Sequence, residues 1–152
     1  MPFDPRRYFE KVERLLNSDH HIGSFSRNGP KISPNLENWS IIAWRETVEF
    51  LSGHKLDFSD NYRSLAGQVM RSFRFHFGDE HGRLVFRFDN HGRHVHCDAP
   101  CHLHIPDSHI PSEDVIEDGD KRLNGLSLIG VDFLVVHKLI HRFFKSGELP
   151  WL

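Results

Sequence analysis

The sequence has few cysteines, no excess of basic residues and no long apolar run. Its two cysteines, Cys97 and Cys101, are too few for a disulfide framework and are expected to be thiols. A formal net charge of −2 excludes a globally basic nucleic-acid-binding protein, so any RNA would be held by a local patch. Residues 1–17 are charged and amphipathic, and the longest apolar run near the carboxyl end is residues 133–136. We therefore expect one domain, residues 1–152, in the cytoplasm and without a membrane span.

An alternation of phenylalanine with polar residues gives the clearest structural signal. It covers residues 72–77 and 84–89, and period-two alternation predicts strands with one apolar and one polar face. A turn at His81-Gly82 would join the two strands into a hairpin. The apolar pairs in that register are Phe77 with Phe86 and Phe75 with Phe88. The polar pairs are Arg74 with Asp89 and His76 with Arg87. A four-residue loop would keep these polar residues on one face but would oppose the two arginines.

The remaining patterns place helices at both ends of the chain. Asp4-Pro5 provides a cap and a first-turn proline for one helix, and an apolar stripe predicts another over residues 132–145, which Gly147 ends. An earlier hairpin turns at Ser52-Gly53, and the polar residues 106–125 indicate a loop. The order of elements predicts an α+β domain. Its antiparallel sheet of about five strands, two hairpins plus a histidine-rich strand, would pack against the N- and C-terminal helices.

Histidine is concentrated in residues 94–104, where four imidazoles and two thiols occur within eleven residues. His94 and His96 share one side of an extended segment, and His102 and His104 share one side of the next. Imidazole titrates near neutral pH and also binds metals, so the stretch suits proton transfer, a metal ion or a merely solvated loop. A single Cys-x-x-x-Cys matches no closed four-ligand zinc pattern, and we expect no metal and no cofactor.

Three motifs, in this order, resemble those of a known family. They are Phe73-Arg74-Phe75-His76-Phe77, the run from Asp79 to Asn90, and Pro100-Cys101-His102-Leu103-His104. The chain resembles the TumE toxins of bacterial toxin-antitoxin pairs, in which an aromatic-rich hairpin ends in Arg-aromatic-Asp-Asn and precedes a Pro-His-His-x-His cluster. The similarity covers roughly residues 39–105, and Cys101 stands in place of the first histidine of that cluster. The resemblance implies a growth-inhibiting toxin that acts on RNA and is neutralised by a helix-turn-helix antitoxin.

The same residues suit a metal-independent ribonuclease of the mRNA interferase type. Such an enzyme needs a base for the ribose 2′-hydroxyl, an acid for the departing 5′-oxygen, and cations for the charge on phosphorus. We predict His102 and His104 as acid and base. Asp89 would orient them, and His76 would be a further catalytic residue. The predicted RNA ligands are Arg74, Arg87, His94, His96 and Asn90.

Other interpretations of these residues stay open. Arg74 and Asp89 could form only a cross-strand ion pair, Asn90 could be a turn former, and the histidines could be merely solvent-exposed. His137 and His141, one helical turn apart, could bind a metal, but they border the apolar stripe and we interpret them as structural. The alternative functions are a non-enzymatic growth inhibitor that binds RNA or protein, and a zinc metallohydrolase built on the His/Cys cluster. If the hairpin phenylalanines are buried, bases cannot stack on them. A homodimer is possible as well as a monomer.

Overall fold

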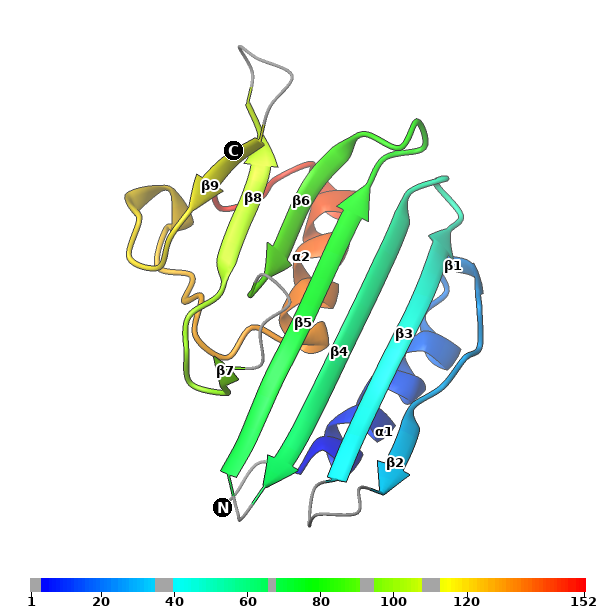
Figure 1. Cartoon of the computed structure of the whole chain (residues 1–152). Coiled ribbons are helices and arrows are strands. Elements are labelled where there is room, and N and C mark those ends of the chain that lie inside the picture. The colour runs from blue at the N-terminus through cyan, green and yellow to red at the C-terminus, as the bar shows by residue number, and fades with distance from the viewer. Residues whose placement is uncertain (1–3, 35–39, 66–67, 91–94, 108–112) are drawn as a thin grey trace.

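The computed structural model describes residues 4–34, 40–65, 68–90, 95–107 and 113–152. It has the predicted α+β architecture, with one antiparallel sheet and two helices behind it in the view of Figure 1. Asp4 caps the first helix and Gly147 ends the last one, as the sequence predicts. Neither of these helices is long and apolar enough to cross a membrane. The elements are α1 (Pro5–Ser18), β1 (Ile22–Phe25), β2 (Lys31–Pro34), β3 (Ser40–Phe50), β4 (Lys55–Leu65), β5 (Gln68–Gly78), β6 (Leu84–Asp89), β7 (Val95–His96), β8 (His102–Pro106), β9 (Glu113–Ile116), the 3-10 helix η1 (Lys121–Leu123) and α2 (Phe133–Ser146).

The described strands form one sheet of nine strands, so the prediction of about five strands is wrong. The order is β1-β3-β4-β5-β6-β8-β9, with β2 also paired to β3 and β7 to β5. Among the strands that the sequence did not indicate, β9 lies within residues 106–125, which were expected to be loop. A strand of four residues is too short to show alternation, and its pairing with a longer strand fixes it instead.

The β5–β6 hairpin has the predicted register. Its pairs are Phe77 with Phe86, Phe75 with Phe88, His76 with Arg87 and Arg74 with Asp89. The connection is longer than the predicted two-residue turn, because a bulge shifts the register between Phe77 and Gly78. The Asp79 carboxylate closes this loop by accepting hydrogen bonds from the backbone N–H groups of His81 and Arg83, each at 2.9 Å. The bulge compensates for the loop length, and the polar side chains therefore stay on one face.

The apolar face of the sheet packs against both helices. Phe9 of α1 contacts Trp44 with ring centroids 5.4 Å apart, and Phe133 of α2 contacts Phe58 at 5.3 Å. The hairpin phenylalanines are buried in this core, namely Phe73, Phe75, Phe77, Phe86 and Phe88. Their burial excludes base stacking on the aromatic ladder. Neither described helix covers the opposite face of the sheet, which is open in Figure 1.

A buried ion pair joins the sheet to both helices. Arg71 of β5 donates to both carboxylate oxygens of Asp60 on β4, each at 2.8 Å, and also to the carbonyl of Val131. Tyr8 of α1 donates to Asp60 at 2.8 Å and accepts a hydrogen bond from the backbone N–H of Phe133 at 2.7 Å. Burial alone would lower the pKa of Arg71, but the Asp60 carboxylate outweighs burial and raises it. The ionised pair therefore fixes both helices to the middle of the sheet.

Candidate functional site

Two rows of polar side chains cross the open face of the sheet. The ladders between β3, β4, β5, β6 and β8 bring every second residue of each strand onto this face. One row is Thr47, Asp57, His76, Arg87 and His104. The adjacent row is Arg45, Ser59, Arg74, Asp89 and His102. The structure thus brings most of the predicted site residues together and adds polar residues from β3 and β4.

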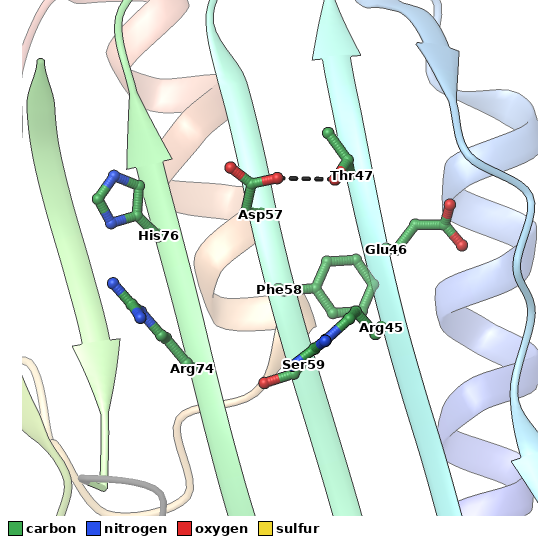
Figure 2. Close-up of a pocket in the computed structure, with 8 residues that line it drawn as sticks. All are labelled: Arg45, Glu46, Thr47, Asp57, Phe58, Ser59, Arg74 and His76. Carbon is green, nitrogen blue, oxygen red and sulfur yellow. Dashed lines mark hydrogen bonds between the residues drawn. The ribbon is translucent and has the colours of Figure 1, made fainter. Parts of the chain in front are cut away.

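A cavity of about 400 Å³ lies on this face over β3, β4 and β5 (Figure 2). Arg45 and Arg74 line it, and neither makes an ion pair with another described residue. The Asp57 carboxylate accepts a hydrogen bond from Thr47 Oγ1 at 2.7 Å. The Glu46 carboxylate is turned to the helix side, where it accepts hydrogen bonds within the core. Two guanidinium groups beside one carboxylate leave the open face of the cavity positive, which suits a phosphate group.

His76 is half-buried beside Arg74 at the edge of this cavity (Figure 2). Its Nδ1 is enclosed and has no hydrogen-bond partner among the described residues. Burial lowers the pKa of His76, and the positive charges of Arg74 and Arg87 lower it further, against weaker opposite effects of Asp57 and Glu113. The imidazole is therefore neutral at neutral pH and able to accept a proton.

The lowered pKa of His76 makes the stability of the fold sensitive to acid. Below about pH 6.5 the unfolded chain takes up a proton on this imidazole that the folded protein resists, so the unfolded state gains stability. The contribution of His76 to the free energy of unfolding is therefore fully present above about pH 6.5. It declines as the pH falls towards the pKa of His76 in the folded protein. We expect His76→Gln to lose less thermal stability than the wild type between about pH 7.5 and about pH 5.5, measured by circular dichroism melting. His81→Gln in the exposed turn is the control, and equal acid sensitivity of all three proteins would contradict the prediction.

Arg87 joins two carboxylates in the neighbouring part of the polar face. Its Nε donates to Asp89 Oδ2 at 2.9 Å, and its Nη1 and Nη2 form a bidentate pair with Glu113 of β9 at 2.9 and 2.6 Å. Burial opposes the charge of Arg87, but the hydrogen bonds to Glu113 and Asp89 outweigh it and raise the pKa of Arg87. The hydrogen bond from Arg87 in turn lowers the pKa of Glu113. Arg87 is thus largely occupied by protein carboxylates.

The two histidines predicted as acid and base differ in their exposure. His104 lies within the Arg87 network, and only 7% of its side chain is exposed. Its Nε2 is 3.6 Å from Asp89 Oδ2, and its Nδ1 is 3.3 Å from Glu113 Oε2. His102 is half-buried and lies opposite Asp89 on the neighbouring strand. Of the two imidazoles, His102 is therefore the more accessible to a substrate.

The other predicted RNA ligands lie away from the cavity or outside the described residues. Asn90 is buried, and both ends of its amide hydrogen-bond to the backbone of β5, which fastens the end of β6. His96 is exposed on β7 opposite Met70, four residues along β5 from Arg74. This spacing corresponds to roughly 13 Å. His94 lies outside the described residues.

The two thiols lie in environments that disfavour the thiolate form. Cys101 is 2% exposed in the core, and burial raises its pKa to about 12. Burial also raises the pKa of Cys97, whose Sγ donates to the carbonyl of Val69 at 3.4 Å. Zinc binds thiolates, so both environments weigh against a zinc site on the His/Cys stretch. Within the described part of the chain, neither thiol belongs to a group of three or more converging metal ligands.

Five polar residues of this face were not identified from the sequence. They are Arg45, Thr47, Asp57, Ser59 and Glu113. The alternation in the first hairpin indicated strands there, but the ambiguous segment 61–69 hid the pairing of β4 with β5. Without that pairing, nothing in the sequence placed Arg45 beside Arg74. Glu113 lies on the unpredicted strand β9 and reaches the site by its ion pair with Arg87.

Comparison with known proteins identifies a toxin family. A family model described as "Toxin TumE" matches residues 12–124, which is most of the chain. The matched region contains all the described strands, and thus both polar rows, and it ends before α2. No curated protein and no solved structure matches the chain.

Proposed function

The chain belongs to the TumE toxin family, and from this premise we propose that it inhibits growth by cleaving RNA on the polar face of its sheet. The observation that carries the proposal is the cavity on that face. There Arg45 and Arg74, which make no ion pair with another described residue, lie beside the neutral imidazole of His76. The family implies an antitoxin partner. We assign that role to a helix-turn-helix protein, and we place the toxin in the cytoplasm with RNA as its substrate.

Arg45 and Arg74 are positioned to hold a phosphate group. They lie in one row on β3 and β5, with Ser59 of β4 between them, so their Cα atoms are roughly 10 Å apart. Long arginine side chains can converge over this distance, and each guanidinium can give two parallel hydrogen bonds to phosphate oxygens. The formal net charge of −2 does not oppose binding, because the attraction is local to the cavity.

His76 and His102 are the groups proposed to move protons. His76 removes the proton of the ribose 2′-hydroxyl, whose oxygen attacks phosphorus, and His102 protonates the 5′-oxygen as its bond to phosphorus breaks. The products are a 2′,3′-cyclic phosphate and a 5′-hydroxyl. His102 is in the same row as Arg74, two strands away, so a phosphodiester that lies across β6 can reach both. His104 is assigned a positioning role together with Arg87, because its ring is almost enclosed.

A second function, RNA binding without cleavage, rests on the same cavity. Arg45 and Arg74 would suffice for it, since phosphate contacts alone give affinity that does not depend on sequence. The buried phenylalanines cannot add stacking, so such binding would weaken strongly with salt. The two functions can be distinguished because only the first one cleaves the RNA.

The ends of the RNA test the proposed function. Purified protein mixed with single-stranded RNA and a chelator should produce 2′,3′-cyclic phosphate and 5′-hydroxyl ends, identified by mass spectrometry. Circular dichroism verifies that the chelated protein is folded. Cleavage that occurs only with added divalent ions would contradict the proposal. If the protein binds the RNA but leaves it fully intact, the second function, RNA binding without cleavage, replaces the proposed ribonuclease activity.

The arginine variants complete this test. Arg45→Ala and Arg74→Ala should each weaken RNA binding and reduce the slope of log affinity against log salt by about 0.7, the value for one phosphate contact on a single strand. The melting temperature should stay close to that of the wild type, because neither side chain makes an ion pair with another described residue. Arg14→Ala removes the same charge from α1 on the helix side and is the matched control. If the slope of log affinity against log salt is unchanged in both cavity variants, Arg45 and Arg74 do not bind phosphate.

A further inference from the structure

A second cluster of histidines lies on the helix side of the sheet, where α1 ends beside α2. Asp19 follows α1, and His137 and His141 lie one turn apart on α2. The Nε2 atoms of His137 and His141 are 2.9 and 2.7 Å from the same oxygen, Asp19 Oδ2. Only 2% of the Asp19 side chain is exposed. One enclosed carboxylate therefore meets two imidazoles from a segment more than a hundred residues away in sequence.

A third imidazole completes the surroundings of this carboxylate. His21 Nδ1 is 3.2 Å from Asp19 Oδ1, the other carboxylate oxygen. The ring of His21 also lies against that of His141, with centroids 4.8 Å apart. His21 converges with Asp19 and His20 and not with the two α2 histidines, so it lies beside their site rather than within it. His21 and His141 are half-exposed, so an ion could reach the cluster from solvent.

The donor set and its spacing match those of a transition-metal site. The ligand atoms of Asp19, His137 and His141 all lie within 4.8 Å of one another. In a tetrahedral zinc site with bonds of about 2.0 to 2.1 Å, neighbouring donors are about 3.3 Å apart. The two Nε2 atoms are 2.9 and 2.7 Å from Asp19 Oδ2, about half an ångström closer than this, so the carboxylate oxygen would withdraw to admit an ion. Imidazole nitrogen and carboxylate oxygen are both ordinary zinc ligands, and two histidines at i and i+4 on a helix can chelate one ion.

We propose that Asp19, His137 and His141 bind one zinc ion, which ties the end of α1 to α2. These three residues leave the fourth position to a water molecule. We assign the ion a structural role, because its ligands join two elements that are far apart in sequence. Both helices lie behind the sheet (Figure 1), whereas the cavity of Arg45 and Arg74 is on the other face. Two of its ligands lie beyond the residues that match the toxin family. The proposal is therefore independent of the proposed ribonuclease activity, and it replaces the purely structural interpretation of the two α2 histidines.

Metal titration of untagged protein tests the site. Protein freed of metal by a chelator should bind one Zn²⁺ per chain in competition with a chromophoric zinc chelator. Zinc at about 100 times its dissociation constant should raise the melting temperature by roughly 5 to 10 °C. Co²⁺ in place of zinc should give the intense visible absorption of a tetrahedral site, without a thiolate charge-transfer band. Absence of saturable binding, or a cobalt spectrum of octahedral type, would overturn the proposal.

Substitutions of single ligands locate the ion. His141→Gln should weaken zinc binding by at least about 10-fold and remove the tetrahedral cobalt spectrum, and His137→Gln should do the same. His141 is the more exposed of the two, so its substitution disturbs the core least. His81→Gln in the β5–β6 turn and Cys97→Ser should bind zinc like the wild type. This location would be refuted if His141→Gln bound zinc with wild-type affinity, or if Cys97→Ser lost zinc binding. If a ligand variant does not fold, the stoichiometry and the cobalt spectrum of the wild-type protein decide the question.

Discussion

Replacing His102 with Gln is expected to reduce the rate of RNA cleavage by about 100-fold or more while the protein stays folded. Gln keeps a similar size and can still form hydrogen bonds, but it cannot exchange protons near neutral pH. His102 is half-buried in the row that contains Arg74 and Asp89, so its ring can reach a phosphate held on this face. The measurement is the rate at which 2′,3′-cyclic phosphate ends appear, together with growth after induction of the toxin.

Two comparisons separate catalysis from folding in this experiment. RNA affinity and melting temperature should be retained in His102→Gln, because the arginines and the core are unchanged. His104→Gln should lose cleavage and also melt at a lower temperature, because His104 is enclosed between Asp89 and Glu113. His81→Gln should cleave like the wild type. Full toxicity and full cleavage in His102→Gln would show that this imidazole is not the acid.

The β5–β6 hairpin could be predicted from the sequence because its information is local. Phe75 and Phe86 belong to runs of strict alternation, and the buried face permits only one of the two parities. A bulge changed the length of the loop but not the side on which Arg74 and His76 lie. The helix ends were equally local, since a cap residue and a glycine at the end act within one turn.

The remaining parts of the site depend on partners that are distant in sequence. Arg45 lines the cavity with Arg74 only because β4 pairs with both β3 and β5. Glu113 lies on a four-residue strand that carries no periodic signal. Asp19 and His141 are separated by 122 residues, and no spacing rule connects the end of one helix with the face of another. Tertiary packing decides all three, so the sequence alone could propose the residue types but not the arrangement.

Asp60→Asn is expected to destabilise the fold by about 3 to 5 kcal/mol, because it leaves the Arg71 guanidinium buried without its counter-ion. For a chain of this size the melting temperature should fall by roughly 6 to 20 °C. Urea unfolding and calorimetry measure the change. Asp120→Asn, at a partly exposed carboxylate paired with Arg122, is the matched control and should shift the melting temperature far less. A loss in Asp60→Asn as small as in the control would show that the buried pair does not hold the helices to the sheet.

The double variant Asp60→Leu with Arg71→Met tests why the pair is costly to break. Apolar residues of similar volume can replace a buried ion pair with little loss, so the double variant should be more stable than Asp60→Asn alone. Recovery should nevertheless be incomplete, because the Tyr8 hydroxyl loses its acceptor on Asp60 while it still accepts from Phe133 at the start of α2. The polar face lies on the other side of the sheet, so the folded fraction should keep its RNA affinity. Loss of RNA binding by folded double variant would instead mean that the core pair also positions the cavity on the opposite face.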